Sequence, residues 1–251
     1  MQQPSLSEIA EGLRHEPEMI AHLIQDWVLH RDGLVLVVNK PGGLPVHSVA
    51  GGKSLHLSQL LFAWQYGLKQ PPLLAHRLDR DTSGCLILAR HRQAMIRMTD
   101  LFASRQVEKC YWAVLDGVPD AESGTITAPL VDMKRPGGVT VRLARPDDGD
   151  DALDAVTDWR VLAVQDRRAW VEFHPRTGRS HQLRVHAASV LGCPIVGDRL
   201  YGRHEAAGLH LHARSVRFAP RANKPPLEVK APVPDGLAEV LARFPYMPSP
   251  D

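Results

Sequence analysis

The run His76–Gly84 places one carboxylate among positive charges. It reads His-Arg-Leu-Asp-Arg-Asp-Thr-Ser-Gly, so Asp79 lies between Arg77 and Arg80, and the apolar stretch 85–89 follows. Nearby positive charge favours the ionised form of a carboxylate. An ionised, oriented carboxylate beside basic groups suits attack on a sugar carbon of a polyanionic substrate. The alternative is a surface turn with solvated charges; the small residues that end the run favour the first interpretation, because they let a substrate come close.

A second constellation, Arg176–His186, is basic and contains three arginines and two histidines. A helix starting near Ser180 would place His181 and Arg184 on one face. Ser180 could cap this helix, and the free amides of a first helical turn favour anions. The segment therefore predicts a phosphate-binding surface. The alternative is a basic helix that faces solvent.

Tyr111 begins a segment that reads as a strand, Tyr-Trp-Ala-Val. Alternation predicts that Tyr111 and Ala113 face one way and that Trp112 and Val114 face the other. From the pattern alone, a tyrosine in this position is more often part of the core than a catalytic group.

The chain has 13 histidines, but they form no familiar metal-ligand spacing. The pairs considered are His210 with His212 and His181 with His186. Neither pair has a cysteine or carboxylate at such a spacing. The segment 51–54, Gly-Gly-Lys-Ser, lacks the glycine that a phosphate-binding loop requires at position 47. We therefore expect no metal and no cofactor.

The elements that must position these residues mix helices and strands. A helical segment is expected at 5–27, with a capping box at Ser5 and Glu8 and a break at Pro17. Further helices are expected at 54–66, 91–104 and 180–191, and strands at 34–38, 85–89, 111–115, 124–129, 139–143, 156–164, 169–174 and 210–218. Hairpins outnumber βαβ units, which predicts an α+β fold with a mixed, mainly antiparallel sheet core and flanking helices. The acidic stretch 146–154 is expected to be a solvated loop, away from any phosphate-binding surface.

The composition is that of an ordinary globular protein. The 30 Lys and Arg residues nearly balance the 28 Asp and Glu residues, giving a net charge of +2, so binding to a polyanion would require local clusters of positive charge. The three cysteines are widely spaced and predict reduced thiols. The N-terminal residues do not read as an export signal, and no apolar run is long enough to span a bilayer. We expect a cytoplasmic protein with no membrane segment.

Several blocks of the sequence resemble the pseudouridine synthases of the RluA class. They are Val38–His47 (VNKPGGLPVH), His76–Gly84 (HRLDRDTSG), Glu108–Val114 (EKCYWAV), Thr177–His186 (TGRSHQLRVH) and Gly192–Gly202 (GCPIVGDRLYG). They occur in the family's order, and the second and fourth are highly specific. The resemblance implies the pseudouridine synthase catalytic fold over residues 31–251. The helical segment predicted from the pattern near the N-terminus would then be an extension over residues 1–30. The protein would isomerise specific uridines in structured RNA, which links it to RNA modification and to rRNA or tRNA processing.

The resemblance also implies roles for individual residues. Asp79 would be the catalytic carboxylate and Arg184 its orienting partner. Tyr111 would stack on the target uracil and take part in moving the proton at ring carbon five, which reverses the interpretation from the pattern alone. Leu183 would pack in the substrate pocket.

Other residues of these blocks are candidates for contact with RNA. As a hypothesis, Arg77 fills the gap left by a flipped-out base, because its planar group can stack on neighbouring bases. Substrate contacts are also expected at His76, Arg80, Arg179 and His181, whose positive or polar groups suit phosphates.

Two other functions remain open from the sequence. A nucleosidase or glycoside hydrolase could use Asp79, but it would normally need a second carboxylate at a suitable distance, and only Asp81 is near in sequence. A catalytically inactive RNA-binding module would not need the set formed by Asp79, Tyr111 and Arg184. Stem-loops of ribosomal or transfer RNA are the expected substrates, and a monomer is expected.

Overall fold

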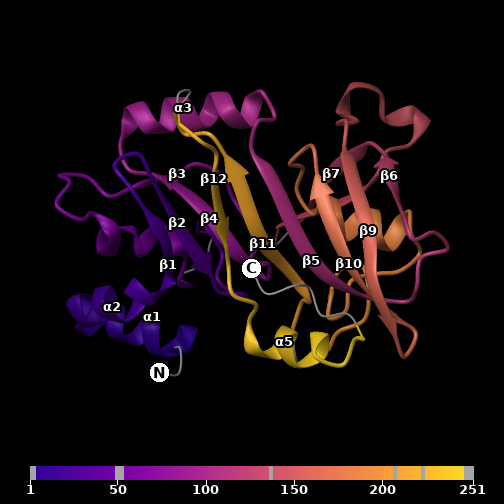
Figure 1. Cartoon of the computed structure of the whole chain (residues 1–251), viewed down its shortest axis with the longest axis horizontal. Coiled ribbons are helices and arrows are strands. Elements are labelled where there is room, and N and C mark those ends of the chain that lie inside the picture. Colours follow the sequence, from indigo (N-terminus) through magenta and orange to yellow (C-terminus); the bar gives the residue numbers. More distant parts are fainter. Residues whose placement is uncertain (1–3, 49–53, 136–137, 206–207, 222–223, 246–251) are drawn as a thin grey trace. The chain divides into compact units, whose positions relative to one another are not determined.

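The computed structural model describes residues 4–48, 54–135, 138–205, 208–221 and 224–245. The chain forms two compact units. Figure 1 labels most of their helices and strands. Unit 1 comprises Met1–Val107 and Ser215–Pro232, and unit 2 comprises Glu108–Arg214 and Val233–Asp251. No helix in the described part of the chain is both long enough and apolar enough to cross a membrane.

Unit 1 is an antiparallel sheet with helices around it. Its elements are α1 (Leu6–His15), α2 (Pro17–Leu23), η1 (Ile24–Trp27), β1 (Val28–Arg31), β2 (Val35–Lys40), η2 (Leu57–Gln59), η3 (Leu61–Trp64), β3 (Leu73–Leu74), β4 (Ser83–Ala89), α3 (Arg92–Ala103) and β12 (Leu227–Lys230). β2 pairs with both β1 and β4. One core joins alternate residues of β2 and β4 to the inner side of α3, as Val37, Ile87 and Met98 illustrate.

The local signals at the N-terminus are confirmed. Ser5 caps α1 and forms the capping box with Glu8. Pro17 occupies the first position of α2, where its missing N–H costs no hydrogen bond, and so it separates the two helices.

The prediction of a regular helix at 54–66 is wrong in the type of helix. Residues 54–66 contain two short 3-10 turns, η2 and η3, joined at Leu60 (φ −97°, ψ −7°). Leu57, Leu60 and Trp64 are nevertheless almost completely buried. A spacing of three residues is shared by both helix types, so the pattern predicted the buried face but not the geometry.

Unit 2 also consists mainly of antiparallel strands, with helices packed on them. Its elements are β5 (Glu108–Asp116), β6 (Ser123–Thr127), β7 (Leu130–Arg135), β8 (Gly138–Leu143), η4 (Pro146–Asp151), β9 (Val156–Gln165), β10 (Arg168–Pro175), α4 (Gln182–Ser189) and α5 (Asp235–Leu241). β10 pairs with β5 and β9, β9 pairs with β6, and β7 and β8 form a separate hairpin. β11 (Leu211–Phe218) begins in unit 2 and ends in unit 1.

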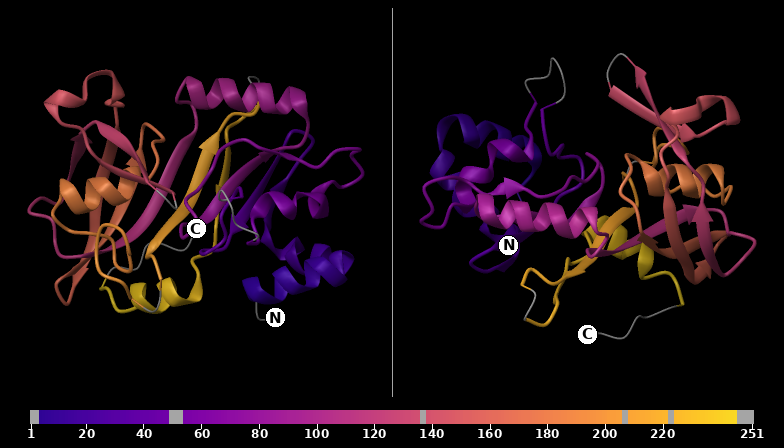
Figure 2. Two further views of the ribbon diagram at one scale, coloured as in Figure 1. Left: turned by 180° about the vertical axis from the view of Figure 1, so that it is seen from behind. Right: turned by 90° about the horizontal axis from the view of Figure 1, so that it is seen from above.

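The two faces of the unit 2 sheet carry different helices (Figure 2). α4 packs on one face, where its Leu183 belongs to the same core as Phe173 of β10. α5 packs on the other face, where its Leu237 joins Trp170 of β10. The predicted α+β fold, with a mainly antiparallel sheet core and flanking helices, is confirmed.

Candidate active site

In unit 1, Asp79 lies in an irregular segment that connects two strands, β3 and β4. Leu78, 6% exposed, anchors the segment in the core, while Asp79 is half-buried and Arg77 is exposed. The amide of Thr82 donates to the carbonyl oxygen of Asp79 at 3.2 Å, which closes a turn just before β4 begins at Ser83. The backbone of Asp79 therefore belongs to a tight turn that leads directly into a fully buried strand.

A buried lysine fixes this turn from the inside. Lys40, at the end of β2, is 0% exposed, and its Nζ donates to the carbonyl oxygens of Pro41 (2.8 Å), Leu44 (2.8 Å) and Arg80 (2.9 Å). Burial lowers the pKa of Lys40 to about 7, opposed by the negative charges of Asp81 and Asp79. The ammonium joins the Pro-Gly-Gly turn to the residue that follows Asp79. Sequence reasoning missed this role; the signal was a lysine that ends an apolar strand.

The Pro-Gly-Gly turn approaches the Asp79 segment closely. A Cβ on Gly42 would lie 3.1 Å from the carbonyl oxygen of Asp81, and Gly43 adopts φ +85°. Residues with a side chain rarely adopt that conformation. The two glycines thus allow the backbone contact that Lys40 stabilises.

Two predicted RNA contacts in unit 1 have partners within the unit. The Nε2 atom of His76 accepts a hydrogen bond from the amide of Ile87 at 3.0 Å, so this nitrogen carries no proton, and the ring packs on Phe102. Arg80 donates to both carboxylate oxygens of Asp81, at 3.0 and 3.1 Å, and its side chain is 57% exposed. His76 therefore has a role in the fold, whereas the guanidinium of Arg80 is accessible. Their contacts with RNA stay predictions.

In unit 2, the structure brings Tyr111 and Leu183 together. Tyr111 is half-buried on β5 and packs against the core that contains Leu183 of α4 and Phe173, its cross-strand partner. Trp112 packs in the opposite core with Trp170. The predicted alternation of this strand is therefore confirmed, and Tyr111 lies on the same side of the sheet as α4.

α4 does not face solvent, so the solvent-facing alternative is wrong. The helix begins at Gln182 and is buried through Ala187. Its N-cap is His181 in a left-handed conformation (φ 50°), so Ser180 is not the cap and His181 is not on a helical face with Arg184. The helix packs against the sheet, so its polar residues are buried together with its apolar ones. All four residues from Leu183 to His186 are buried.

Arg184 is held by a buried carboxylate that the sequence did not reveal. Its Nε and NH2 groups donate to the two oxygens of Asp198 at 2.8 and 2.7 Å, and the side chains are 6% and 0% exposed. Burial by itself raises the pKa of Asp198, but hydrogen bonds and charge from Arg184 and backbone hydrogen bonds from Leu200 and Tyr201 bring it below its usual value. The guanidinium is thus pre-oriented within unit 2.

Tyr201 connects several of these residues. Its ring lies 5.2 Å from the guanidinium carbon of Arg184, and its hydroxyl group lies 2.8 Å from the Nδ1 atom of His181 and accepts from the amide of Val141 at 2.8 Å. His181 is therefore a half-buried side chain fixed by Tyr201. Its contact with phosphate stays a prediction.

Gln182 organises the loop that precedes α4. Its Oε1 accepts from the hydroxyl of Thr177 (2.7 Å) and the amide of Arg179 (3.0 Å), and its Nε2 donates to Thr157 Oγ1 at 2.9 Å. Arg179 is exposed, and its Nε donates to the carbonyl oxygen of Asp154 at 3.0 Å. The end of the acidic stretch at Asp154 therefore lies beside Arg179, a predicted phosphate contact, which is contrary to expectation. Residues 146–151 of the stretch are largely exposed, as predicted.

The comparisons with known proteins agree with one another. The family model for RNA pseudouridylate synthase matches residues 34–189. An uncharacterized RNA pseudouridine synthase of Zymomonas mobilis is 44% identical over 216 residues, which cover 85% of this chain and 96% of that protein. The mitochondrial pseudouridylate synthase RPUSD4 of Xenopus tropicalis is 31% identical over 91% of this chain and 83% of its own. The chain belongs to the RluA-type RNA pseudouridine synthases.

The fold agrees with this assignment. The solved structure of human RNA pseudouridylate synthase domain containing 4 matches with a TM-score of 0.76 and 30% identity, covering 92% of this chain and 97% of that chain. That of human RNA pseudouridylate synthase domain containing 1 matches with a TM-score of 0.68 and 29% identity, covering 86% of each chain. The protein is a pseudouridine synthase, an isomerase that acts on RNA.

The predicted site residues of this synthase are divided between the units. Unit 1 holds Asp79 with Arg77, His76 and Arg80, and unit 2 holds the remainder: Tyr111, Leu183, Arg184, Arg179 and His181. The pairing of Arg184 with Asp79 across this division stays a prediction.

Proposed function

We propose that Asp79 is the catalytic carboxylate of this synthase, that Arg184 pairs with it, and that Tyr111 stacks on the target uracil. The observation that carries the proposal is the Asp79 turn: a half-buried carboxylate on a backbone that Lys40 holds through buried hydrogen bonds. A carboxylate needs this combination of access and rigidity to act on a substrate, because preorganisation removes the cost of orienting the group during the reaction.

The reaction breaks the bond between base and sugar, turns the base and rejoins it through carbon. Asp79 performs the first step in one of two ways: it attacks the anomeric carbon, as a retaining glycosidase nucleophile does, or it removes a proton from the neighbouring ribose carbon to give a glycal. The products contain the same atoms as the substrate, so the reaction consumes no oxidant, reductant or nucleotide. Tyr111 keeps the detached uracil in place by stacking and takes part in moving the proton at ring carbon five.

Substitutions in the Asp79 turn test the first role. Asp79→Asn keeps the size of the side chain but removes the charge, so we expect loss of pseudouridine formation in a transcribed stem-loop RNA labelled at uracil carbon five, with an unchanged unfolding midpoint. Full isomerisation by this variant would refute the proposal. Release of free uracil by the wild type would instead favour a nucleosidase, and RNA binding without any reaction would favour an inactive binding module.

Two variants of Tyr111 separate its two roles. Tyr111→Phe keeps the ring and removes the hydroxyl group, whereas Tyr111→Leu removes the ring as well. Stacking alone predicts that only Tyr111→Leu loses the trapped base. A role in proton transfer predicts that Tyr111→Phe also slows the reaction.

The substrates proposed for this synthase are stem-loops of ribosomal or transfer RNA, and its proposed location is the cytoplasm, where it acts as a monomer. Exposed arginines support contact with phosphate: Arg179 and Arg80 each present a side chain to solvent. Replacing either by alanine should weaken RNA binding and reduce its salt dependence by about one charge.

Arg77→Ala should lower affinity and turnover together if Arg77 fills the gap left by the flipped uridine. Mapping pseudouridines in total RNA from cells lacking the protein identifies the substrate.

A further inference from the structure

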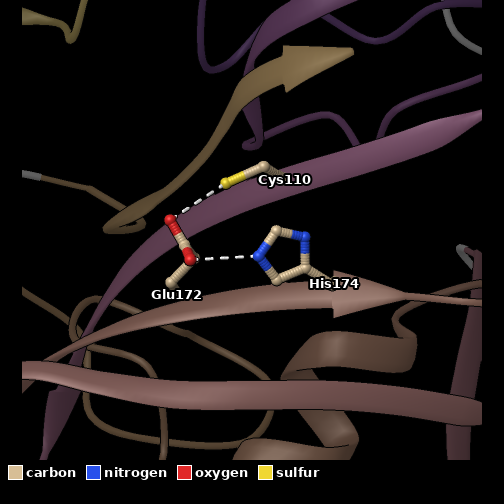
Figure 3. A group of neighbouring side chains, drawn as sticks. All are labelled: Cys110, Glu172 and His174. Atoms are coloured by element: carbon tan, nitrogen blue, oxygen red, sulfur yellow. Dashed lines mark hydrogen bonds and ion pairs between the residues drawn. The ribbon is translucent and has the colours of Figure 1, made fainter. Parts of the chain in front are cut away.

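Three side chains with metal-binding atoms, Cys110, Glu172 and His174, meet on the unit 2 sheet (Figure 3). They lie on the face opposite Tyr111, as the strand positions show. Cys110 lies on β5 next to Tyr111 in sequence, and successive residues of a strand point to opposite faces. Glu172 and His174 lie two residues apart on β10 and so share a face. Glu172 is the cross-strand partner of Trp112, which packs on the α5 side of the sheet.

The sulfur, nitrogen and oxygen atoms that could bind a metal lie close to one another. The Sγ atom of Cys110 donates to Oε2 of Glu172 at 3.4 Å, and the Nε2 atom of His174 lies 3.0 Å from Oε1 of the same carboxylate. All three ligand atoms lie within 4.8 Å of one another. In a tetrahedral zinc site, metal–ligand bonds of about 2.0–2.3 Å place neighbouring ligand atoms about 3.3–3.5 Å apart. The observed spacing thus requires only small side-chain shifts.

The chemistry of the group also fits a metal. Hydrogen bonds from His174, and then from Arg160 and Trp112, lower the pKa of Glu172 to about 2 against the effect of burial, so the carboxylate is ionised. The thiol of Cys110 and the imidazole of His174 each donate a hydrogen bond to this carboxylate, marked by the dashed lines in Figure 3. A divalent cation would replace those hydrogens and be bound by the atoms that carry them.

We propose that Cys110, Glu172 and His174 bind a thiophilic divalent metal ion, with zinc the best match to a ligand set of sulfur, imidazole nitrogen and carboxylate oxygen. The fourth position would be taken by water. On binding, Cys110 loses its thiol proton to solvent, and His174 coordinates through an Nε2 atom that no longer carries a hydrogen. Metal binding therefore releases protons.

Arg160 competes with the metal for Glu172. Its NH2 group lies 2.7 Å from Oε1, but the side chain is 63% exposed, so it can turn into solvent when a cation binds. Removing this guanidinium should strengthen metal binding. A purely structural hydrogen-bond network would predict no such gain.

The experiment uses the full chain after removal of metals by a chelator. Zinc is titrated against a chromophoric chelator, proton release is followed in weak buffer, and cobalt replaces zinc to report thiolate coordination by its near-ultraviolet charge-transfer absorption. We expect one zinc per chain and loss of the cobalt absorption in Cys110→Ser. Cys110→Ser and His174→Ala should each weaken zinc binding by roughly 100-fold or more, because loss of even an outer-shell partner costs about 10–100-fold.

Two further variants make the result decisive. His204→Ala removes an exposed histidine outside the group and should leave zinc affinity unchanged. Arg160→Ala should tighten binding, and because the side chain is exposed its folding is not in question. Unchanged affinity in Cys110→Ser, weakening by His204→Ala equal to that by His174→Ala, or no gain in Arg160→Ala would each overturn the proposal.

Discussion

The buried ion pair between Arg184 of α4 and Asp198 is expected to make a large contribution to the stability of the protein. The carboxylate of Asp198 receives four hydrogen bonds: two from the guanidinium, one from the amide of Leu200 (2.9 Å) and one from the amide of Tyr201 (3.2 Å). Asp198→Asn keeps the shape and one acceptor oxygen, which can retain the bonds now made to Oδ1. The amide nitrogen would then face the Nε–H of Arg184, donor against donor, and the buried guanidinium would have lost the charge of this carboxylate.

The magnitude follows from burial. The side chains of Arg184 and Asp198 are 6% and 0% exposed, so water cannot replace the lost partner. Removing one member of such a buried pair costs about 3–5 kcal/mol. For a protein of this size, that lowers the melting temperature by roughly 6–20 °C. We also expect slower pseudouridine formation, because Arg184 is no longer held in one orientation.

A matched control exists in the same unit. Arg176 and Asp158 form an equally bidentate pair, at 2.6 and 2.9 Å, but their side chains are 60% and 31% exposed. Asp158→Asn should therefore destabilise the protein by only a small fraction of the Asp198→Asn effect, because exposed ion pairs contribute little. Urea unfolding followed by tryptophan fluorescence measures both variants. Equal costs would refute the argument from burial.

The pH dependence gives a second check on the same pair. The folded-state pKa of Asp198 is lowered. Its contribution to stability is therefore complete above the unfolded-state pKa of about 3.9 and is lost as the pH falls through the lower, folded-state pKa. The difference between wild type and Asp198→Asn should shrink over this acid range. A difference that stays constant down to the lowest pH at which the protein folds would contradict the assignment.

Two further predictions concern the turn that carries Asp79. Because the folded-state pKa of Lys40 is about 7, below its unfolded value, the unfolded chain binds more protons above that pH. The stability of wild type relative to Lys40→Met should therefore rise from about pH 7 to about pH 10, by at most about 1.4 kcal/mol per pH unit; a flat difference in urea titrations would contradict this. Gly43→Ala should cost about 1–2 kcal/mol, because its φ is +85°. Gly236→Ala, in α5 with open space around the added methyl group, should stabilise by about 0.5–1 kcal/mol. Equal effects of the two alanines would count against the strain at Gly43.

Local patterns in the sequence determined much of the fold. Alternation in the strand that contains Tyr111 assigned neighbouring residues to opposite cores, and the Ser5 capping box and Pro17 delimited the first two helices. These signals are short-range, since each depends on hydrogen bonds or side-chain directions within a few residues. The charges around Asp79 singled out that carboxylate from the sequence, whereas only the resemblance to a family pointed to its pairing with Arg184.

The tertiary structure decided which partners the polar residues have. Asp198 lies 14 residues from Arg184, and Glu172 lies 62 residues from Cys110, so no sequence spacing links them. Lys40 reaches the carbonyl of Arg80, 40 residues away, only because β2 and β4 pair in one register. The sequence by itself determined many of the segments that are strands or helices and which of their faces are apolar. It did not predict the 3-10 geometry of 57–64, the strands β1, β7 and β12 or the helix α5. Strand register and helix docking decided which charges are buried together, because a buried polar group must find its partner among whatever residues packing brings next to it.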